Sequence, residues 1–313
     1  MLIKFAHSHQ AQGEIAQIER IIARDVGRGI QPLAEYAKGG LLASARSIAI
    51  HSKPHVAIVT GFFVTSGNPP AAETDGPVGC AHLASGLLRL GIPVRIVTDS
   101  LCYRAIKAAV WAAGVPGSVP FDVIPVEGNR SQDEVTALLS YWQSLKHPVT
   151  HIISIERPGP GYDGVIYNMK GVDISAHTPP LHLLFNAPYL TSIGIGDGGN
   201  EIGMGAIPQE IIAENILHGE KIACMTPCDF VIVCGVSNWG ATGLLATLAL
   251  LRPEWKDLIV KGLHPDRELG ILAALVYEGP GVDGVTGEKY LSVDNLPYSF
   301  HLKVMQEINE VIR

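Results

Sequence analysis

Charged and aromatic residues are scarce in this sequence of 313 residues. Charged residues make up 17% and aromatic residues 6% of the chain, whereas an average globular protein is about 25% charged. The 23 basic residues are outnumbered by 30 acidic residues, giving a net charge of −7. This balance excludes a nucleic-acid binder or a protein of anionic membrane surfaces, because both need a basic face. With 47% apolar residues, the chain is not disordered, and we expect a large core and a small-molecule partner.

Cysteine is too rare for a secreted disulfide framework, since the five cysteines are an odd number and most lie in apolar runs. Cys224 and Cys228 are four residues apart with no second pair, so we expect buried, inert thiols rather than a zinc site. The first twenty residues have no apolar signal core and already carry Glu14 and Glu19. We therefore expect neither secretion nor organelle import, and a cytoplasmic protein.

One apolar run without a charge, residues 230–251, reaches the length of a membrane span. Its middle, GVSNWG at residues 235–240, is polar and rich in glycine. Such a break predicts a buried strand, a loop and a buried helix over 241–251 instead of one long helix. No membrane segment is expected.

Strand and helix patterns alternate along most of the chain. The first fifty residues read as helical, and short β-branched runs without polar alternation then alternate with amphipathic segments, as in strands that are covered on both faces. This order predicts a three-layer α/β/α fold with a mostly parallel, doubly wound, Rossmann-like sheet. We expect a single α/β domain over 1–313, with a helical N-terminal extension at 1–53 and the main domain at 54–313. The predicted strands are 55–62, 93–99, 121–126, 151–155, 191–195 and 230–234, and the predicted helices are 78–90, 131–145, 209–218, 241–251, 267–277 and 299–312, with a further helix opening at Thr178-Pro179-Pro180.

Glycine together with a carboxylate or an amide follows four of the predicted strands. Ligands of such sheets bind beyond the carboxyl ends of the strands, where loops and helix starts converge. The glycines lack the GxGxxG spacing of a dinucleotide fingerprint, and no Walker lysine occurs. The segments are GNPPAAETDGP with Glu73 and Asp75, SIERPGPGYDG with Glu156, Arg157 and Asp163, GDGGNEIGMG with Asp197, Asn200 and Glu201, and GVSNWG with Ser237 and Asn238.

Each segment taken alone also has a purely structural interpretation. Asp197 could close a tight turn, with Asn200 as a helix N-cap and Glu201 in the first helical turn. Arg157 could pair with a neighbouring acid, and Asp163-Gly164 is an ordinary turn dipeptide. Taken together the acids favour a site, because two carboxylates about 4 Å apart repel by about 4 kcal/mol at an effective dielectric constant near 20. Such a cluster holds a divalent cation, binds an ammonium group or keeps one acid protonated.

The motifs ETDGP, SIERPGPGYDG, GIGDGGNEIGMG and GVSNWG, in this order and spacing, resemble the carboxy-terminal domain of the D-glutamate cyclase family. The resemblance extends from about residue 54 to the C-terminus. It implies a hydro-lyase that converts D-glutamate to 5-oxo-D-proline and water. In eukaryotic members this domain follows a second, hydro-lyase-like domain and the protein is mitochondrial, whereas here we expect the domain alone.

The resemblance and the chemistry of lactam formation together suggest roles for these residues. The amine must lose a proton, the γ-carboxylate must be neutralised, and its oxygen must leave. Neutralisation could come from Arg157, from Mg²⁺ or Mn²⁺, or from the backbone N–H groups of Gly198 and Gly199 at a helix start. We expect Glu156, Asp197 and Glu201 to be catalytic, and Asp75, Asp197 and Glu201 to hold a metal ion if one is bound. The expected substrate-binding residues are Glu73, Asp75, Arg157, Asp163, Asn168, Gly198, Gly199, Asn200, Ser237 and Asn238.

Two other classes of function fit the same acidic loops. One is a metal-dependent hydrolase of a small anionic metabolite. The other is a module that binds an amino acid without turning it over. The sequence leaves the identity and handedness of the substrate, the metal and homo-oligomer formation open.

Overall fold

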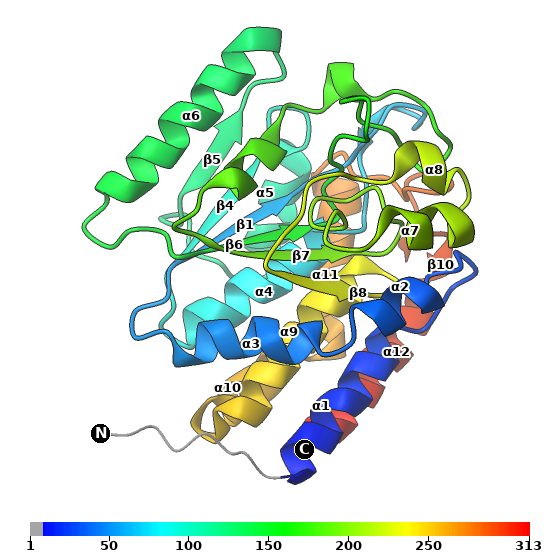
Figure 1. Ribbon diagram of the computed structural model, residues 1–313. Coiled ribbons are helices and arrows are strands. Elements are labelled where there is room, and N and C mark those ends of the chain that lie inside the picture. Colours follow the sequence, from blue (N-terminus) through cyan, green and yellow to red (C-terminus); the bar gives the residue numbers. More distant parts are fainter. Residues whose placement is uncertain (1–8) are drawn as a thin grey trace.

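Six parallel strands form the central sheet of the protein in a computed structural model, of which residues 9–313 are described here. The strand order is β5-β4-β1-β6-β7-β8, so the chain builds the sheet outward from β1 in one direction and then from β6 in the other (Figure 1). This doubly wound arrangement confirms the predicted fold class. The strands are β1 (Val56–Thr60), β4 (Val94–Asp99), β5 (Phe121–Ile124), β6 (His151–Ile155), β7 (Thr191–Gly196) and β8 (Phe230–Val233).

The point where the strand order reverses lies between β1 and β6, which pair in parallel from Val56 with His151 to Thr60 with Ile155. Every residue of these two strands is buried, which explains why neither strand alternates between apolar and polar residues. Loops diverge at such a switch point and leave a crevice beyond the strand ends. The connections that follow β1 and β6 therefore define where a ligand can enter.

Helices cover both faces of this sheet (Figure 1). The two-stranded pairs β2 (Phe63–Val64) with β3 (Ala71–Ala72) and β9 (Ser292–Val293) with β10 (Leu296–Pro297) lie outside it. The helices are α1 (His9–Ile22), α2 (Gln31–Tyr36), α3 (Gly40–Ile50), α4 (Pro77–Arg89), α5 (Tyr103–Ala112), α6 (Gly128–Ser144), α7 (Gln209–Asn215), α8 (Gly219–Ile222), α9 (Ser237–Leu251), α10 (Lys256–Gly262), α11 (Pro265–Ala273) and α12 (Tyr298–Ile312).

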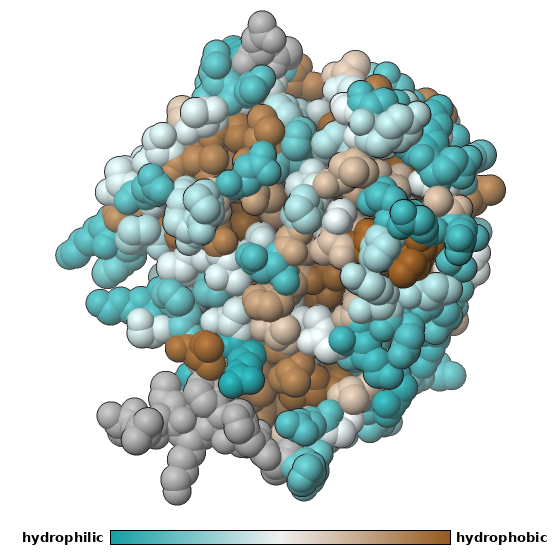
Figure 2. Space-filling view, viewed as in Figure 1, coloured by the Kyte–Doolittle hydropathy of each residue, from teal (hydrophilic) through white to brown (hydrophobic). Residues whose placement is uncertain are grey.

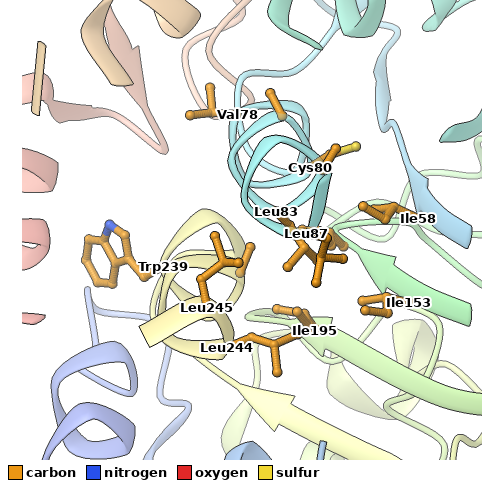
Figure 3. Close-up of a cluster of buried hydrophobic side chains, with 14 of the residues drawn as sticks. Ile58, Val78, Cys80, Leu83, Leu87, Ile153, Ile195, Trp239, Leu244 and Leu245 are labelled. Atoms are coloured by element: carbon orange, nitrogen blue, oxygen red, sulfur yellow. The ribbon is translucent and has the colours of Figure 1, made fainter. Parts of the chain in front are cut away.

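The larger core lies between the sheet and the helices α4 and α9. Figure 3 shows Leu83 and Leu87 of α4 and Leu244 of α9 beside Ile153 and Ile195 of the sheet. Helix α9 is buried almost all round because α1, α3 and α12 pack on its other sides. It therefore has no amphipathic stripe, and its uncharged sequence reflects burial in protein.

A second, smaller core fills the opposite face of the sheet. There Trp142 of α6 and Leu184 pack against Val59 and Ile152 of the strands. Most of the surface in Figure 2 is polar, with separate apolar areas between the polar side chains. Within residues 9–313, no helix combines the length and the apolar character that a bilayer span needs.

The structure differs from the predicted elements at several places, and the short helices α8 and α10 and the strand pairs β2–β3 and β9–β10 are among the elements that were not predicted. Helix α5 was not predicted, the residues after Thr178-Pro179-Pro180 form a short 3-10 helix (Leu181–Asn186), and α9 begins four residues earlier than expected, at Ser237. Val236, the residue before α9, offers no side-chain cap, so no local signal marks this helix start. Part of the expectation about targeting rests on residues 1–8, which lie outside the described residues.

The cysteines agree with the prediction of inert thiols. All five are free, and Cys228 alone is not fully buried. Burial raises the pKa of Cys224 to about 12, so this thiol is protonated at neutral pH. No disulfide framework contributes to the fold.

Candidate functional site

Three carboxylates from distant parts of the chain meet beyond the carboxyl ends of the central strands. One oxygen each of Asp75, Glu156 and Asp197 lies within 4.8 Å of the others, and all three residues are buried. Asp75 comes from the connection between β1 and α4, while Glu156 and Asp197 directly follow β6 and β7. The structure thus brings together acids that the strand-end rule places on one edge of the sheet.

Glu156 occupies the switch point in a strained backbone conformation. Its φ angle is +49°, which costs a non-glycine residue about 1–3 kcal/mol and persists only where the surroundings impose it. Its Oε2 accepts a hydrogen bond of 2.5 Å from Ser237 Oγ. Burial, with the charge of Asp197 next, raises the pKa of Glu156 well above its ordinary value.

Asp75 serves as an N-terminal cap for helix α9 from a distant part of the chain. Its carboxylate accepts the backbone N–H groups of Ser237 at 2.8 Å and Asn238 at 2.9 Å, as well as that of Gly76 at 2.9 Å. These bonds favour the charged form, but burial and the charge of Asp294 outweigh them and raise the pKa of Asp75 to about 7.

Asn238 ties the starts of α4 and α9 together. Its Oδ1 accepts the N–H groups of Gly76 at 3.0 Å and Gly79 at 2.6 Å, and its Nδ2 donates to Thr74 O at 3.2 Å. These partners are backbone groups of the β1–α4 connection and of the first turn of α4. The side chain of Asn238 therefore positions the loop that carries Asp75.

Glu201 organises the loop after β7. Its Oε1 accepts the N–H groups of Asp197 at 2.8 Å and Gly198 at 2.6 Å, while its Oε2 is buried without a hydrogen-bond partner. The expectation of a helix start at Gly198-Gly199 is wrong, because the next helix begins only at Gln209. Asn200 and Glu201 are likewise not a helix cap and a first-turn acid, and the Gly198 N–H is already bonded.

Both terminal nitrogens of Arg157 contact the protein, while its Nε is buried without a hydrogen-bond partner. Its buried Nη1 forms an ion pair with Asp99 and donates to Gly61 O at 2.6 Å, and its Nη2 lies 3.4 Å from Pro179 O. These contacts connect the ends of β4 and β6 with the start of the β1–α4 connection. The structure supports the pairing interpretation of Arg157.

Asp163 lies in an exposed turn, where its carboxylate accepts hydrogen bonds from Tyr167 Oη at 2.7 Å and Val165 N at 3.0 Å. The bond from Tyr167 lowers the pKa of Asp163. The geometry of Asp163 corresponds to the turn interpretation.

Asn200 Nδ2 donates to Tyr167 O at 2.8 Å, and its Oδ1 is buried without a partner.

A pocket of about 320 Å³ opens beside the carboxylates. Phe62, Phe63 and Met169 form part of its apolar wall. Glu73 of the β1–α4 connection and Glu156 after β6 belong to its acidic lining. Glu73 is buried, its Oε1 has no hydrogen-bond partner, and burial raises its pKa well above the ordinary value. Asn168 lines the pocket too, while its Oδ1 accepts Lys170 N at 2.9 Å.

Two residues of the site were missed by the sequence analysis. Arg28, between α1 and α2, forms ion pairs with Asp197 and with Asp294 of the β9–β10 turn, and Arg28 and Asp294 both line the pocket. Neither follows a strand of the central sheet. Gly27 and Gly29 on either side of Arg28 are the only local signal, because such glycines mark a tight turn.

The donor set Asp75, Glu156 and Asp197 suits a hard divalent cation such as Mg²⁺ or Mn²⁺, which prefers carboxylate oxygens. Asp197 Oδ2 is buried without a hydrogen-bond partner, so it is free to bind a cation. Glu201 was expected as a metal ligand in place of Glu156, yet the cluster contains Glu156. The ammonium group of a ligand would satisfy the same oxygens.

Comparison with known proteins identifies the family. Residues 18–309 match the family model described as D-glutamate cyclase-like, C-terminal. The chain is 30% identical over 335 aligned positions to human mitochondrial D-glutamate cyclase, covering 97% of this chain and 53% of that protein. The chain thus spans about half the length of this relative. The protein belongs to the D-glutamate cyclase-like C-terminal family.

Proposed function

We propose that this protein is a hydro-lyase that cyclises D-glutamate to 5-oxo-D-proline with release of water. The observation that carries the proposal is the buried cluster of Asp75, Glu156 and Asp197 beside a pocket of amino-acid size. Family membership supports the same reaction. The cluster supplies negative charge for an ammonium group, and its raised pKa values suit groups that exchange protons near neutral pH.

The reaction forms an N–C bond and breaks a C–O bond of the γ-carboxylate. Of the three ammonium protons, one remains on the lactam nitrogen and two leave with the departing oxygen as water. A base must therefore take a proton from nitrogen, and an acid must deliver a proton to oxygen. Glu156 is suited to this exchange, because it lines the pocket and Ser237 Oγ is hydrogen-bonded to it.

Neutralisation of the γ-carboxylate needs a cation or hydrogen-bond donors. Two groups expected for this task already have partners within the protein: the Gly198 N–H is bonded to Glu201, and the Arg157 guanidinium is ion-paired with Asp99. Mg²⁺ or Mn²⁺ held by Asp75, Glu156 and Asp197 would, when bound, polarise the γ-carboxylate as a Lewis acid. In that case Glu73, which has an unpartnered buried oxygen at the pocket and, unlike Asp294, no ion pair with Arg28, is suited to accept the proton.

The test uses NMR to monitor the formation of 5-oxoproline from D-glutamate and, in a separate reaction, from L-glutamate. We expect turnover of the D-isomer and a loss of at least about 100-fold in Glu156→Gln, with Glu254→Gln at an exposed position as the control. Assays after chelation and after addition of Mn²⁺ separate the metal-free from the metal-assisted route. Absence of product from D-glutamate under both conditions would contradict the proposal.

A further inference from the structure

The loop that carries Arg28 is held rigidly by its own hydrogen bonds. The Asp25 carboxylate accepts the backbone N–H groups of Gly27, Arg28 and Gly29 at 2.8–3.2 Å. Gly27 and Gly29 have φ angles of +100° and +82°, which a residue with a side chain adopts only under strain. Ile30 follows and is fully buried. The backbone therefore fixes the point from which the Arg28 side chain enters the site.

The Arg28 guanidinium lies between two carboxylates of the pocket. Nη1 forms the ion pair with Asp197, and Nη2 lies 3.0 Å from Asp294 Oδ1. Arg28 keeps 18% of its side chain exposed and lines the pocket. Although burial opposes its charge, the two carboxylates raise the pKa of Arg28 above its ordinary value. Arg28 is thus a permanent cation at the edge of the acid cluster.

These ion pairs leave bonding capacity at the site. Asp197 Oδ2 and Asp294 Oδ2 are both buried without a hydrogen-bond partner, and Arg28 Nη1, although ion-paired with Asp197, also has no hydrogen-bond partner. A buried ion pair that exists only for stability normally has all its oxygens satisfied, because unpaired buried polar atoms cost free energy. The planar guanidinium also matches a carboxylate with two parallel hydrogen bonds. The arrangement therefore suits a ligand that brings both a cationic donor and an anionic acceptor.

We propose that Arg28 binds the α-carboxylate of the substrate. This inference rests on the proposed function and adds the group that recognises an α-amino acid. In an α-amino acid the ammonium and the carboxylate share one carbon, so their binding sites must be adjacent. Asp197 belongs to the acid cluster and contacts Arg28, which provides this adjacency. The N-terminal segment thereby contributes directly to substrate recognition.

A pair of ring compounds tests the proposal without relying on turnover. We would measure binding of 5-oxo-D-proline and of 2-pyrrolidinone, the same lactam without the carboxylate, by calorimetry. In the wild-type protein the carboxylate should improve affinity at least about tenfold, the size of one charge-assisted hydrogen bond. Arg28→Gln should abolish this preference and leave 2-pyrrolidinone binding unchanged, while Arg28→Lys should retain part of it.

Arg24→Gln is the matched control, because Arg24 pairs with Glu307 of α12 and does not line the pocket. This variant should keep the full preference for the carboxylated ring. If Arg28→Gln does not fold, the proposal is still tested by two measurements: the wild-type preference for 5-oxo-D-proline over 2-pyrrolidinone, and the partial loss of this preference in Arg28→Lys. No preference in the wild type, or a full preference in either Arg28 variant, would overturn the proposal. Arg28-dependent binding without any turnover of D-glutamate would contradict the proposed reaction but not the carboxylate site.

Discussion

Ser237 Oγ donates a 2.5 Å hydrogen bond to Glu156 Oε2 and so connects the first turn of α9 with the end of β6. The same residue donates its backbone N–H to Asp75. One serine therefore contacts two of the three clustered acids. Because its hydroxyl stabilises the charged form of Glu156, it opposes the increase in pKa that burial causes.

Ser237→Ala should shift the pH dependence of turnover to higher pH. Loss of the donor raises the pKa of Glu156 further, so a larger fraction of this base is protonated at any given pH. The acidic limb of kcat/KM should move upward, and kcat/KM at neutral pH should fall about tenfold. Ser154→Ala is the control, since Ser154 Oγ is buried in β6 without a hydrogen-bond partner. An unmoved limb in Ser237→Ala would show that Glu156 is not the titrating base.

Glu156→Gly should increase stability and abolish turnover. Glycine adopts the +49° φ angle without strain, and the change also removes a buried carboxylate. We expect a gain of about 1–2 kcal/mol in the free energy of unfolding, measured in urea. His218→Gly separates the relief of backbone strain from the removal of a buried carboxylate. His218 has a φ angle of +62°, but its side chain is exposed. The gain in the free energy of unfolding should be smaller in His218→Gly, and this variant should retain turnover. A Glu156→Gly protein less stable than the wild type would refute the strain argument.

Asp99→Asn should destabilise the protein strongly through Arg157. Both members of this ion pair are buried, and removing one partner of a buried pair costs about 3–5 kcal/mol. Glu254→Gln, which breaks an exposed pair with Arg252, should cost no more than about 1 kcal/mol. Arg157→Gln tests the alternative role. If it weakens D-glutamate binding while the urea midpoint is unchanged, Arg157 serves the substrate rather than the fold.

Glu268→Gln should flatten the pH dependence of stability. Burial in α11 raises the pKa of Glu268 from 4.5 to about 7, and its Oε2 lacks a partner. The folded state therefore holds a proton that the unfolded state has released, and stability falls as pH rises from about 4.5 to 7. At pH 8 the variant should be more stable by up to about 3 kcal/mol, with no difference below pH 4.

Urea titrations at several pH values measure this difference. Asp266→Asn on the same helix is the control, because its side chain is 90% exposed. The control should show no comparable change. If the stability of Glu268→Gln depends on pH as strongly as that of the wild type, other acids account for the dependence. One such acid is Asp75, whose pKa is about 7.

The sequence was sufficient for the sheet and for most of its helices. Buried parallel strands leave β-branched runs without alternation, as in β1 and β6, and each is followed by a loop whose glycines and acids can be recognised. The convergence of Asp75, Glu156 and Asp197 then follows from topology, because parallel strands end on one edge. Their roles in chemistry stay predictions.

The start of α9 and the part played by Arg28 could not be predicted in the same way. Asp75 caps α9 from a distant part of the chain, so the sequence around Ser237 contains no capping residue before it. Arg28 and Asp294 reach the pocket through packing of the N-terminal segment and the β9–β10 turn beside the sheet. Such contacts depend on tertiary structure and leave no periodic pattern in the sequence.

The ion pair between Arg28 and Asp294 has a consequence for synthesis of the chain. Arg28 precedes the six strands of the central sheet in the sequence and Asp294 follows them, so the two partners are synthesised on either side of the sheet. The strands and the clustered acids can assemble before Asp294 is synthesised, but the cavity obtains its last wall only once the β9–β10 turn has emerged. The wall of the pocket therefore depends on a contact that can form only after all six strands have been synthesised.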